Sequence, residues 1–159
     1  MEDLTSFSIH IQLVVSVKMA IAAVLGAIIG WERDRAGKAA GTRTMSLVGT
    51  SSALIVAIGE VLNEGADFGD PTRALHAVVT GIGFLGAGLI FTIDRSKEIQ
   101  GVTTAATVFS TACMGIAVGL GFYVTAVASA LTVIIVLRST YILEKAQNVR
   151  TSTKSSSAE

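Results

Sequence analysis

One lysine lies where a charge is costly, within a long and otherwise uncharged run at residues 10–30. A run of that length can span a bilayer, and a lysine at the bilayer centre costs about 3 kcal/mol on insertion scales. We favour snorkelling, in which the Lys18 side chain extends along its helix and brings the ammonium group towards the membrane surface. The alternative is functional, with Lys18 paired to a buried carboxylate such as Glu60.

Hydroxyl side chains are the second candidate for chemistry. They recur at three- and four-residue spacings along one side of a predicted helix, at Thr103, Thr104, Thr107, Ser110 and Thr111. A second group precedes them, at Ser46, Thr50, Ser51 and Ser52. Such hydroxyls either donate hydrogen bonds between helices, at about 1 kcal/mol each, or line a polar path. We favour hydrogen bonding, because a path for a divalent cation is expected to carry acidic residues near mid-membrane, whereas Glu60 and Asp70 lie near predicted helix ends.

The segment GIGFLG, residues 81–86, matches the dinucleotide-binding pattern GxGxxG. That pattern functions only after a strand, in a loop open to water, with an acidic residue about twenty positions later. Here the flanking residues are apolar and helical in pattern. We therefore interpret these glycines as helix-packing positions and expect no nucleotide cofactor.

Metal and covalent chemistry have no support in the sequence. Neither His10 nor His76 has a second histidine or a carboxylate at ligand spacing, so both are interpreted as polar residues at the membrane surface. The single cysteine, Cys113, excludes an internal disulfide. No pattern typical of a catalytic triad, a nucleophile elbow or a P-loop is present. We expect no enzymatic activity, no metal site, no cofactor and no nucleic-acid partner.

The elements that position these residues are long apolar helices. Of 159 residues, 51% are hydrophobic and only 15% are charged, where a soluble domain carries about a quarter. Uncharged or nearly uncharged runs occupy residues 10–30, 44–62, 73–93, 102–120 and 121–140. The sequence therefore predicts an all-α, polytopic membrane protein, a single bundle of five transmembrane helices over residues 1–143. A disordered, polar cytoplasmic tail is expected over residues 144–159.

The third run has the strongest helix signals and the most glycine. Asp70 is a good N-cap, and Pro71 fits the first helical position, where its missing N–H is not needed. Small residues allow helix backbones to approach closely in lipid. We therefore expect this helix to be packed on more than one side within the bundle, with Gly83 and Gly86 as contact points.

Two further glycine pairs have the GxxxG spacing of close helix contacts. They are Gly26 with Gly30 in the first helix and Gly115 with Gly119 in the fourth. The segment GLGF, residues 119–122, predicts a tight turn into the last helix.

Basic residues predict the orientation. Ten of the twelve lysines and arginines fall in the first join, the third join and the segment after the fifth helix, which lie on one side of the membrane. The opposite side has only Arg73, with several acidic residues. The positive-inside rule then places the N-terminus outside and the C-terminus in the cytoplasm.

The first join, WERDRAGKAAGTR at residues 31–43, holds four cations and two anions around Gly37 and Gly41. A flexible cationic loop of this kind can bind lipid phosphate or an acidic surface of a partner. It can equally serve only to anchor the topology, which is the interpretation that we favour from the loop alone.

Several motifs in unbroken order, GWERDRAGKAAGTRT, DPTR, GIGFLGAG, GVTTAAT and AVGLG, resemble the MgtC/SapB family of bacterial inner-membrane proteins. The resemblance covers about residues 17–140 and implies five helices. The positions that match the family signature are Glu32, Arg33, Gly41, Arg43, Thr44, Asp70, Pro71, Arg73, Gly81, Gly83, Gly86, Gly88, Gly101, Thr104 and Ala105.

The chain departs from the family pattern in three places. Members commonly have leucine and histidine or asparagine around the AGxRT motif, where this chain has Thr42 and Met45. They carry a tryptophan in the fourth helix, where it has Phe109. Founding MgtC proteins also continue into a soluble cytoplasmic domain, so the resemblance concerns the membrane module.

The resemblance implies a multi-pass protein of the bacterial inner membrane, associated with adaptation to low magnesium or acid stress. Family members look more like regulators of other membrane proteins, including the F-type ATP synthase and cation transporters, than like pumps. The expected partners are therefore the lipid bilayer, a membrane protein and a second copy of the chain. A small magnesium transporter or channel is the alternative, and a purely structural oligomer is a third.

Overall fold

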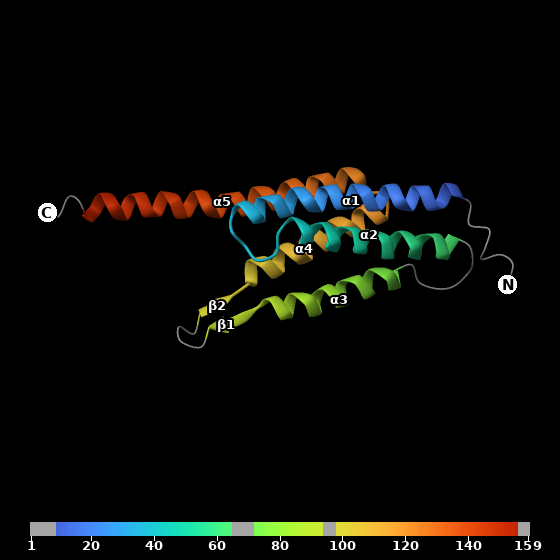
Figure 1. Cartoon of the computed structure of the whole chain (residues 1–159), viewed down its shortest axis with the longest axis horizontal. Coiled ribbons are helices and arrows are strands. Elements are labelled where there is room, and N and C mark those ends of the chain that lie inside the picture. Colours follow the sequence, from blue (N-terminus) through green and yellow to red (C-terminus); the bar gives the residue numbers. More distant parts are fainter. Residues whose placement is uncertain (1–8, 65–71, 94–97, 156–159) are drawn as a thin grey trace.

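The computed structural model describes residues 9–64, 72–93 and 98–155, with side chains omitted at 64, 92–93, 98 and 140–155. These ranges form five helices and one short hairpin: α1 Ile9–Arg35, α2 Thr42–Glu64, α3 Thr72–Leu89, β1 Phe91–Ile93, β2 Glu98–Gln100, α4 Val102–Gly119 and α5 Tyr123–Ser155 (Figure 1). Helices α1 to α4 are each long and apolar enough to cross a membrane, and α5 has a shorter apolar part, Tyr123–Ser139. The prediction of an all-α polytopic bundle is confirmed.

Two earlier predictions fall partly outside the described residues. Asp70 and Pro71 lie in the undescribed segment before α3, so their capping role stays a prediction. The division into a membrane domain, residues 1–143, and a polar tail, residues 144–159, also stays a prediction, because no side chain after Ser139 is described.

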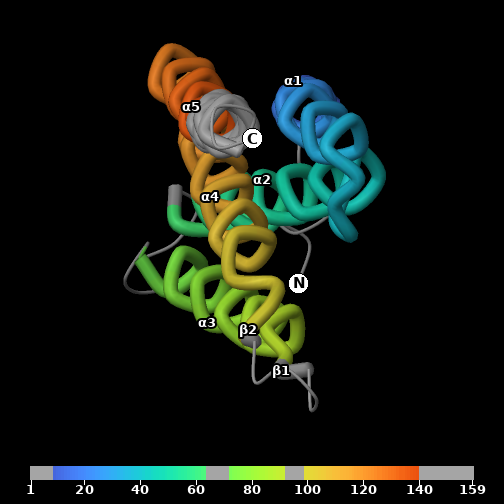
Figure 2. The backbone as a smooth tube through the Cα atoms, turned by 90° about the vertical axis from the view of Figure 1, so that its left-hand side faces the viewer, coloured from blue at the N-terminus to red at the C-terminus, as the bar shows by residue number. Residues whose placement is uncertain are grey.

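Helices α2 and α4 form the centre of the bundle. Helix α1 packs against α2, and α4 contacts each of the other helices, as the end-on view in Figure 2 shows. Half of α4 is buried, compared with 11% of α3. The buried core consists of small and medium side chains, including Ala22, Ile29, Met45, Val108 and Met114. Small side chains bring these helices close together.

The two predicted GxxxG contacts are confirmed. A Cβ atom on Gly26 would lie 2.5 Å from the carbonyl oxygen of Met45, and one on Gly30 would collide with the backbone of Thr42. On α4, a Cβ on Gly119 would lie 2.9 Å from the carbonyl oxygen of Ala53. Glycine is therefore required where α1 and α4 cross α2, because any side chain there would meet backbone.

The position predicted for α3 is wrong within this chain. Nothing lies within 4 Å of a Cβ built on Gly81, Gly83 or Gly88, and a Cβ on Gly86 would make only an ordinary contact, 3.8 Å from Ala105. Helix α3 lies at the edge of the bundle and packs mainly on α4 (Figure 2). The glycine count of a helix is therefore not a measure of its burial, since the contacts that require glycine are made by α1 and α4.

A β-hairpin separates α3 from α4, so the expected continuation of a helix to residue 93 is wrong. Helix α3 ends at Leu89, and β1 pairs antiparallel with β2 in the register Phe91 to Gln100. Gly101 then begins α4 with φ of 87°, and a Cβ there would collide with the carbonyl of Leu89. The uncharged run at 90–93 is rich in β-branched and aromatic residues, which favour a strand over the end of a helix.

The predicted tight turn between α4 and α5 is confirmed and is a Schellman motif. The N–H of Phe122 donates to the carbonyl of Ala117 at 2.8 Å, and the N–H of Gly121 donates to that of Val118 at 3.0 Å. Gly121 has φ of 82°, which glycine adopts without a steric penalty. The motif ends α4 sharply and reverses the chain into α5.

Candidate functional site

The join between α1 and α2 is built as a fixed structure rather than the flexible loop that its glycines predict. Asp34 accepts two hydrogen bonds from Thr42, from the backbone N–H at 3.0 Å and from the hydroxyl at 2.6 Å. Gly37, with φ of 65°, ends α1 in a second Schellman motif, in which Lys38 N–H donates to the carbonyl of Arg33 at 3.1 Å. A Cβ on Gly41 would collide with the Asp34 carboxylate. The conformation of the join is therefore determined at both ends.

Three cations are exposed around this join. The side chains of Arg35, Lys38 and Arg43 are all exposed, while the carboxylate of Asp34 accepts hydrogen bonds from Thr42. The guanidinium of Arg35 lies over the Trp31 ring, 4.9 Å from its centroid, which is a cation–π contact. The join thus presents a basic surface, defined here by Arg35, Lys38 and Arg43, on a fixed backbone.

Arg33 points in the opposite direction, into the contact between α1 and α4. Its side chain is 2% exposed, and its guanidinium donates a hydrogen bond to the hydroxyl of Thr104. The Nε of Arg33 is buried and has no hydrogen-bond partner. Among the described residues, no carboxylate pairs with it. A buried charge with one neutral acceptor is costly, and the nearby carboxylate of Glu32 offsets only part of that cost.

The family-signature positions separate into two groups. At one end of the bundle the structure brings together Arg33 with Thr104, Ala105 and Gly101 at the start of α4, while Gly41, Arg43 and Thr44 begin α2 next to the join. Glu32 is half-buried there. The glycines of α3 and the exposed Arg73 lie along α3, which packs on α4, so Gly86 is next to Ala105 of the first group, whereas Arg73 lies at the other end of α3. Asp70 and Pro71 lie outside the described residues, so a single site formed by all the signature positions stays a prediction.

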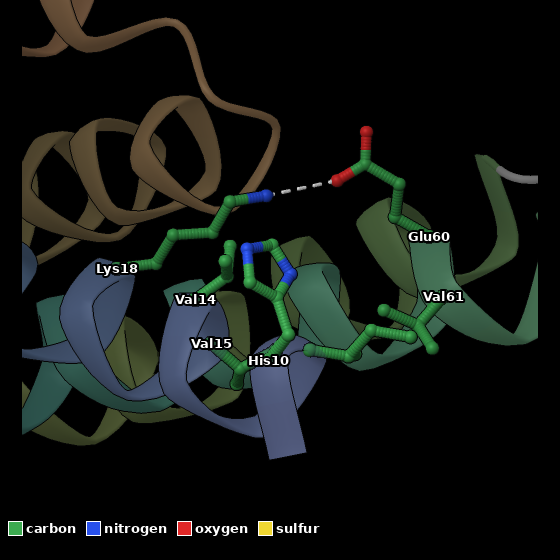
Figure 3. A pocket seen from close by; sticks show the side chains of 7 residues that line it. His10, Val14, Val15, Lys18, Glu60 and Val61 are labelled. Carbon is green, nitrogen blue, oxygen red and sulfur yellow. Dashed lines mark hydrogen bonds and ion pairs between the residues drawn. The ribbon is translucent and has the colours of Figure 1, made fainter. Parts of the chain in front are cut away.

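Lys18 pairs with Glu60, so the expected snorkelling of Lys18 is wrong and the alternative, a carboxylate partner, is confirmed. The ammonium Nζ lies 3.1 Å from Glu60 Oε2 and donates a second hydrogen bond, at 2.7 Å, to the carbonyl of Gly119 (Figure 3). One lysine thus connects α1, α2 and the end of α4. The side chains of Lys18 and Glu60 are 14% and 39% exposed, so the pair is accessible from one side.

A cavity of about 290 Å³ surrounds this ion pair, between the N-terminal half of α1 and the C-terminal end of α2. Its lining residues are His10, Ile11, Val14, Val15, Lys18, Glu60 and Val61. Figure 3 shows the imidazole of His10 directed into the same space as the Lys18 ammonium. The cavity is therefore lined both by polar groups, from His10, Lys18 and Glu60, and by apolar side chains.

The hydroxyls of the predicted stripe bond both within α4 and between helices. Thr107, Ser110 and Thr111 each donate to the carbonyl four residues earlier in α4, at 2.7 to 2.9 Å. Among the described hydroxyls of the two predicted groups, three bond between helices: Ser46 donates to the carbonyl of Ala23 at 3.1 Å, Thr104 accepts from Arg33, and Thr111 also contacts the sulfur of Met45 at 3.4 Å. The interpretation as interhelical hydrogen bonding is therefore confirmed for Thr104 and Thr111 and wrong for Thr107 and Ser110, because a helix offers each hydroxyl a nearer acceptor in its own backbone.

Comparison with known proteins identifies the family. A family model described as the MgtC family matches residues 19–146, which is most of the chain. The chain belongs to the MgtC family. No solved structure matches it. The matched range covers both groups of signature positions as well as the exposed cations of the join.

Curated relatives agree with membership of the MgtC family. The chain is 37% identical over 126 residues to "Putative magnesium transporter YhiD" of Escherichia coli K12, covering 76% of this chain and 58% of that protein. It is 34% identical to Protein MgtC of Salmonella paratyphi A, covering 90% and 58%, and 34% identical to Protein SapB of Bacillus subtilis, covering 75% and 53%. The chain thus spans a little over half the length of these relatives.

Proposed function

We propose that this MgtC-family chain regulates other proteins of the bacterial inner membrane, such as the ATP synthase or cation transporters, during magnesium limitation or acid stress. It does so by binding an acidic surface of the partner. The observation that carries the proposal is the fixed join between α1 and α2, which exposes Arg35, Lys38 and Arg43. A preorganised surface loses little conformational entropy on binding. Complementary charge then favours the correct partner and speeds the encounter.

The proposal includes the orientation, with the join in the cytoplasm. The join, the hairpin and the C-terminal part of α5 lie at the same end of the bundle in Figure 1. Of the ten basic residues assigned to one side by sequence, those of the join lie at this end, and Arg138, Lys145, Arg150 and Lys154 belong to α5, which leads from it. The positive-inside rule places such an end in the cytoplasm, where a soluble part of a partner is accessible.

The experiment replaces one exposed cation of the join. Arg43→Ala should abolish growth in low-magnesium medium and reduce co-purification of the membrane partner, with an unchanged amount of protein in the membrane. Arg138→Ala, which removes an exposed cation from α5, is the matched control and should leave growth unchanged. Normal growth and normal co-purification in Arg43→Ala would instead assign the join to topology alone.

A transporter is the second candidate, and one observation favours it: the Lys18–Glu60 ion pair in a cavity within two membrane-spanning helices. Ionisable residues at membrane depth often belong to substrate pathways. The printed name of the Escherichia coli relative also refers to magnesium transport. Purified protein in liposomes with an inward magnesium gradient and a membrane potential should show no flux if the regulatory proposal is correct. Saturable flux that is lost in Glu60→Gln would replace it with the transporter.

A further inference from the structure

We propose that the cavity around Lys18 and Glu60 binds a zwitterionic phosphoethanolamine group, as carried by phosphatidylethanolamine. The site lies towards one end of the bundle, near the ends of the two helices that line it. Glu60 is four residues, about 6 Å, from the end of α2, and His10 is the second residue of α1. This inference is independent of the regulatory function, because it concerns the opposite end of the bundle from the join.

The ion pair retains unused hydrogen-bonding capacity. A lysine ammonium has three N–H donors. Lys18 donates one hydrogen bond to Glu60 Oε2 and another to the carbonyl of Gly119, which leaves one donor. The second carboxylate oxygen of Glu60 points away from the ammonium in Figure 3 and accepts no hydrogen bond from any described residue. One donor of Lys18 and one acceptor of Glu60, of opposite charge, therefore remain available at the cavity.

This arrangement selects for a ligand that carries both charges. A lone anion attracted by Lys18 would be repelled by Glu60, and a lone cation would be repelled by Lys18. A dipolar ion can satisfy both groups without breaking their pair: its phosphate accepts from Lys18, and its ammonium donates to the free oxygen of Glu60. A primary ammonium is required for this, since a trimethylated one has no N–H to donate.

The apolar part of the cavity fits the rest of a lipid. Ile11, Val14 and Val15 line the cavity along α1, and the neighbouring Leu13 and Val17 are 60% and 57% exposed. An acyl chain attached to a headgroup in the cavity would extend along this apolar surface of α1. The same headgroup chemistry is also present in free phosphoethanolamine, which lacks that contact.

The test is performed on the purified 159-residue chain in vesicles that contain phosphatidylcholine with either phosphatidylethanolamine or phosphatidylglycerol. Lipid retained after mild delipidation is counted by native mass spectrometry. We expect phosphatidylethanolamine to be retained about tenfold over either other lipid, as one charge-assisted hydrogen bond allows. Glu60→Gln and Lys18→Met should each remove this preference. Arg35→Gln, which removes an exposed cation at the other end, should keep it.

A competition experiment on the unaltered protein distinguishes phosphatidylethanolamine from free phosphoethanolamine. It does not require that the variants fold. Displacement of bound lipid by an equal concentration of free phosphoethanolamine would assign the cavity to a water-soluble zwitterion. Retention of the lipid under that competition would assign it to phosphatidylethanolamine. Equal retention of all three lipids by the unaltered protein would overturn the proposal, as would an unchanged preference in Glu60→Gln. The ion pair would then serve only to hold α1, α2 and α4 together.

Discussion

The carboxylate of Asp34 at the end of α1 caps Thr42 at the start of α2, through hydrogen bonds of 2.6 and 3.0 Å from the hydroxyl and the backbone N–H. The cap comes from the preceding helix, eight residues earlier, instead of from the residue that adjoins α2. It therefore couples the end of one helix to the beginning of the next. The exposed cations of the join depend on this coupling for their fixed positions.

Removing the cap should loosen the join. We expect Asp34→Ala to lower the free energy of unfolding by about 1 to 2 kcal/mol, because a Thr42 N–H at a helix start loses its acceptor. Asp34→Asn, which keeps a side-chain oxygen, is the control and should lose less than half of that. Thermal unfolding in detergent measures both. Equal melting temperatures for Asp34→Ala and the unaltered protein would show that the join holds its shape without the cap.

The two kinds of glycine should respond differently to the same substitution. Gly26→Leu places a side chain against the backbone of α2. It should lower the free energy of unfolding by about 1 to 3 kcal/mol and weaken the contact between α1 and α2. Gly83→Leu meets open space on α3 and should be tolerated or slightly stabilising, since leucine favours helix more than glycine does. Melting temperature and membrane abundance are the measurements. If Gly83→Leu proves as damaging as Gly26→Leu, another chain must pack on that face.

Loss of the Thr104 hydroxyl should lower the free energy of unfolding more than loss of the Thr107 hydroxyl, one turn later in α4. Thr104→Val leaves the buried guanidinium of Arg33 without its acceptor and should cost about 1.5 to 3 kcal/mol. Thr107→Val makes the same chemical change at a buried position. The hydroxyl lost there donates only to the carbonyl of Thr103 in the same helix, so no buried group loses its sole partner. Thermal unfolding of the two variants compares them directly. Similar losses would mean that Arg33 gains little from Thr104.

Topology can be tested with single cysteines in a Cys113→Ser background. The ten-to-one distribution of basic residues predicts that a cysteine at Ala66 reacts with an impermeant thiol reagent in intact cells. A cysteine at Ala39, exposed in the join, should react only after permeabilisation. The reverse labelling pattern would place the join outside and remove the basis for a cytoplasmic partner.

The sequence predicts what depends on composition and short spacing. Apolar runs located the helices, and the four-residue spacings of Gly26 with Gly30 and Gly115 with Gly119 correctly indicated close contacts. It cannot show which partner a side chain meets across the bundle. Arg33 and Thr104 are 71 residues apart, and Lys18 and Glu60 are 42 apart, so no local pattern joins them.

The predicted close packing of α3 was wrong for the same reason: the sequence does not show which surface a residue meets across the bundle. GIGFLGAG contains more glycine than either GxxxG pair, yet close packing requires a complementary surface as well as a small residue. The complementary surface is the backbone of α2, and the glycines of α1 and α4 already pack against it. The hairpin after α3 was missed because a short uncharged strand and the end of an apolar helix have similar composition.

The peripheral position of α3 also determines the order in which the bundle can be completed during synthesis. Helices α1 and α2 share the most extensive contact and emerge from the ribosome first, so they can join as a pair at once. Helix α3 contacts this pair only slightly, and its main partner, α4, is made after it. Until α4 has been made, α3 therefore lacks a partner helix along most of its length. The short hairpin then places α4 next to it.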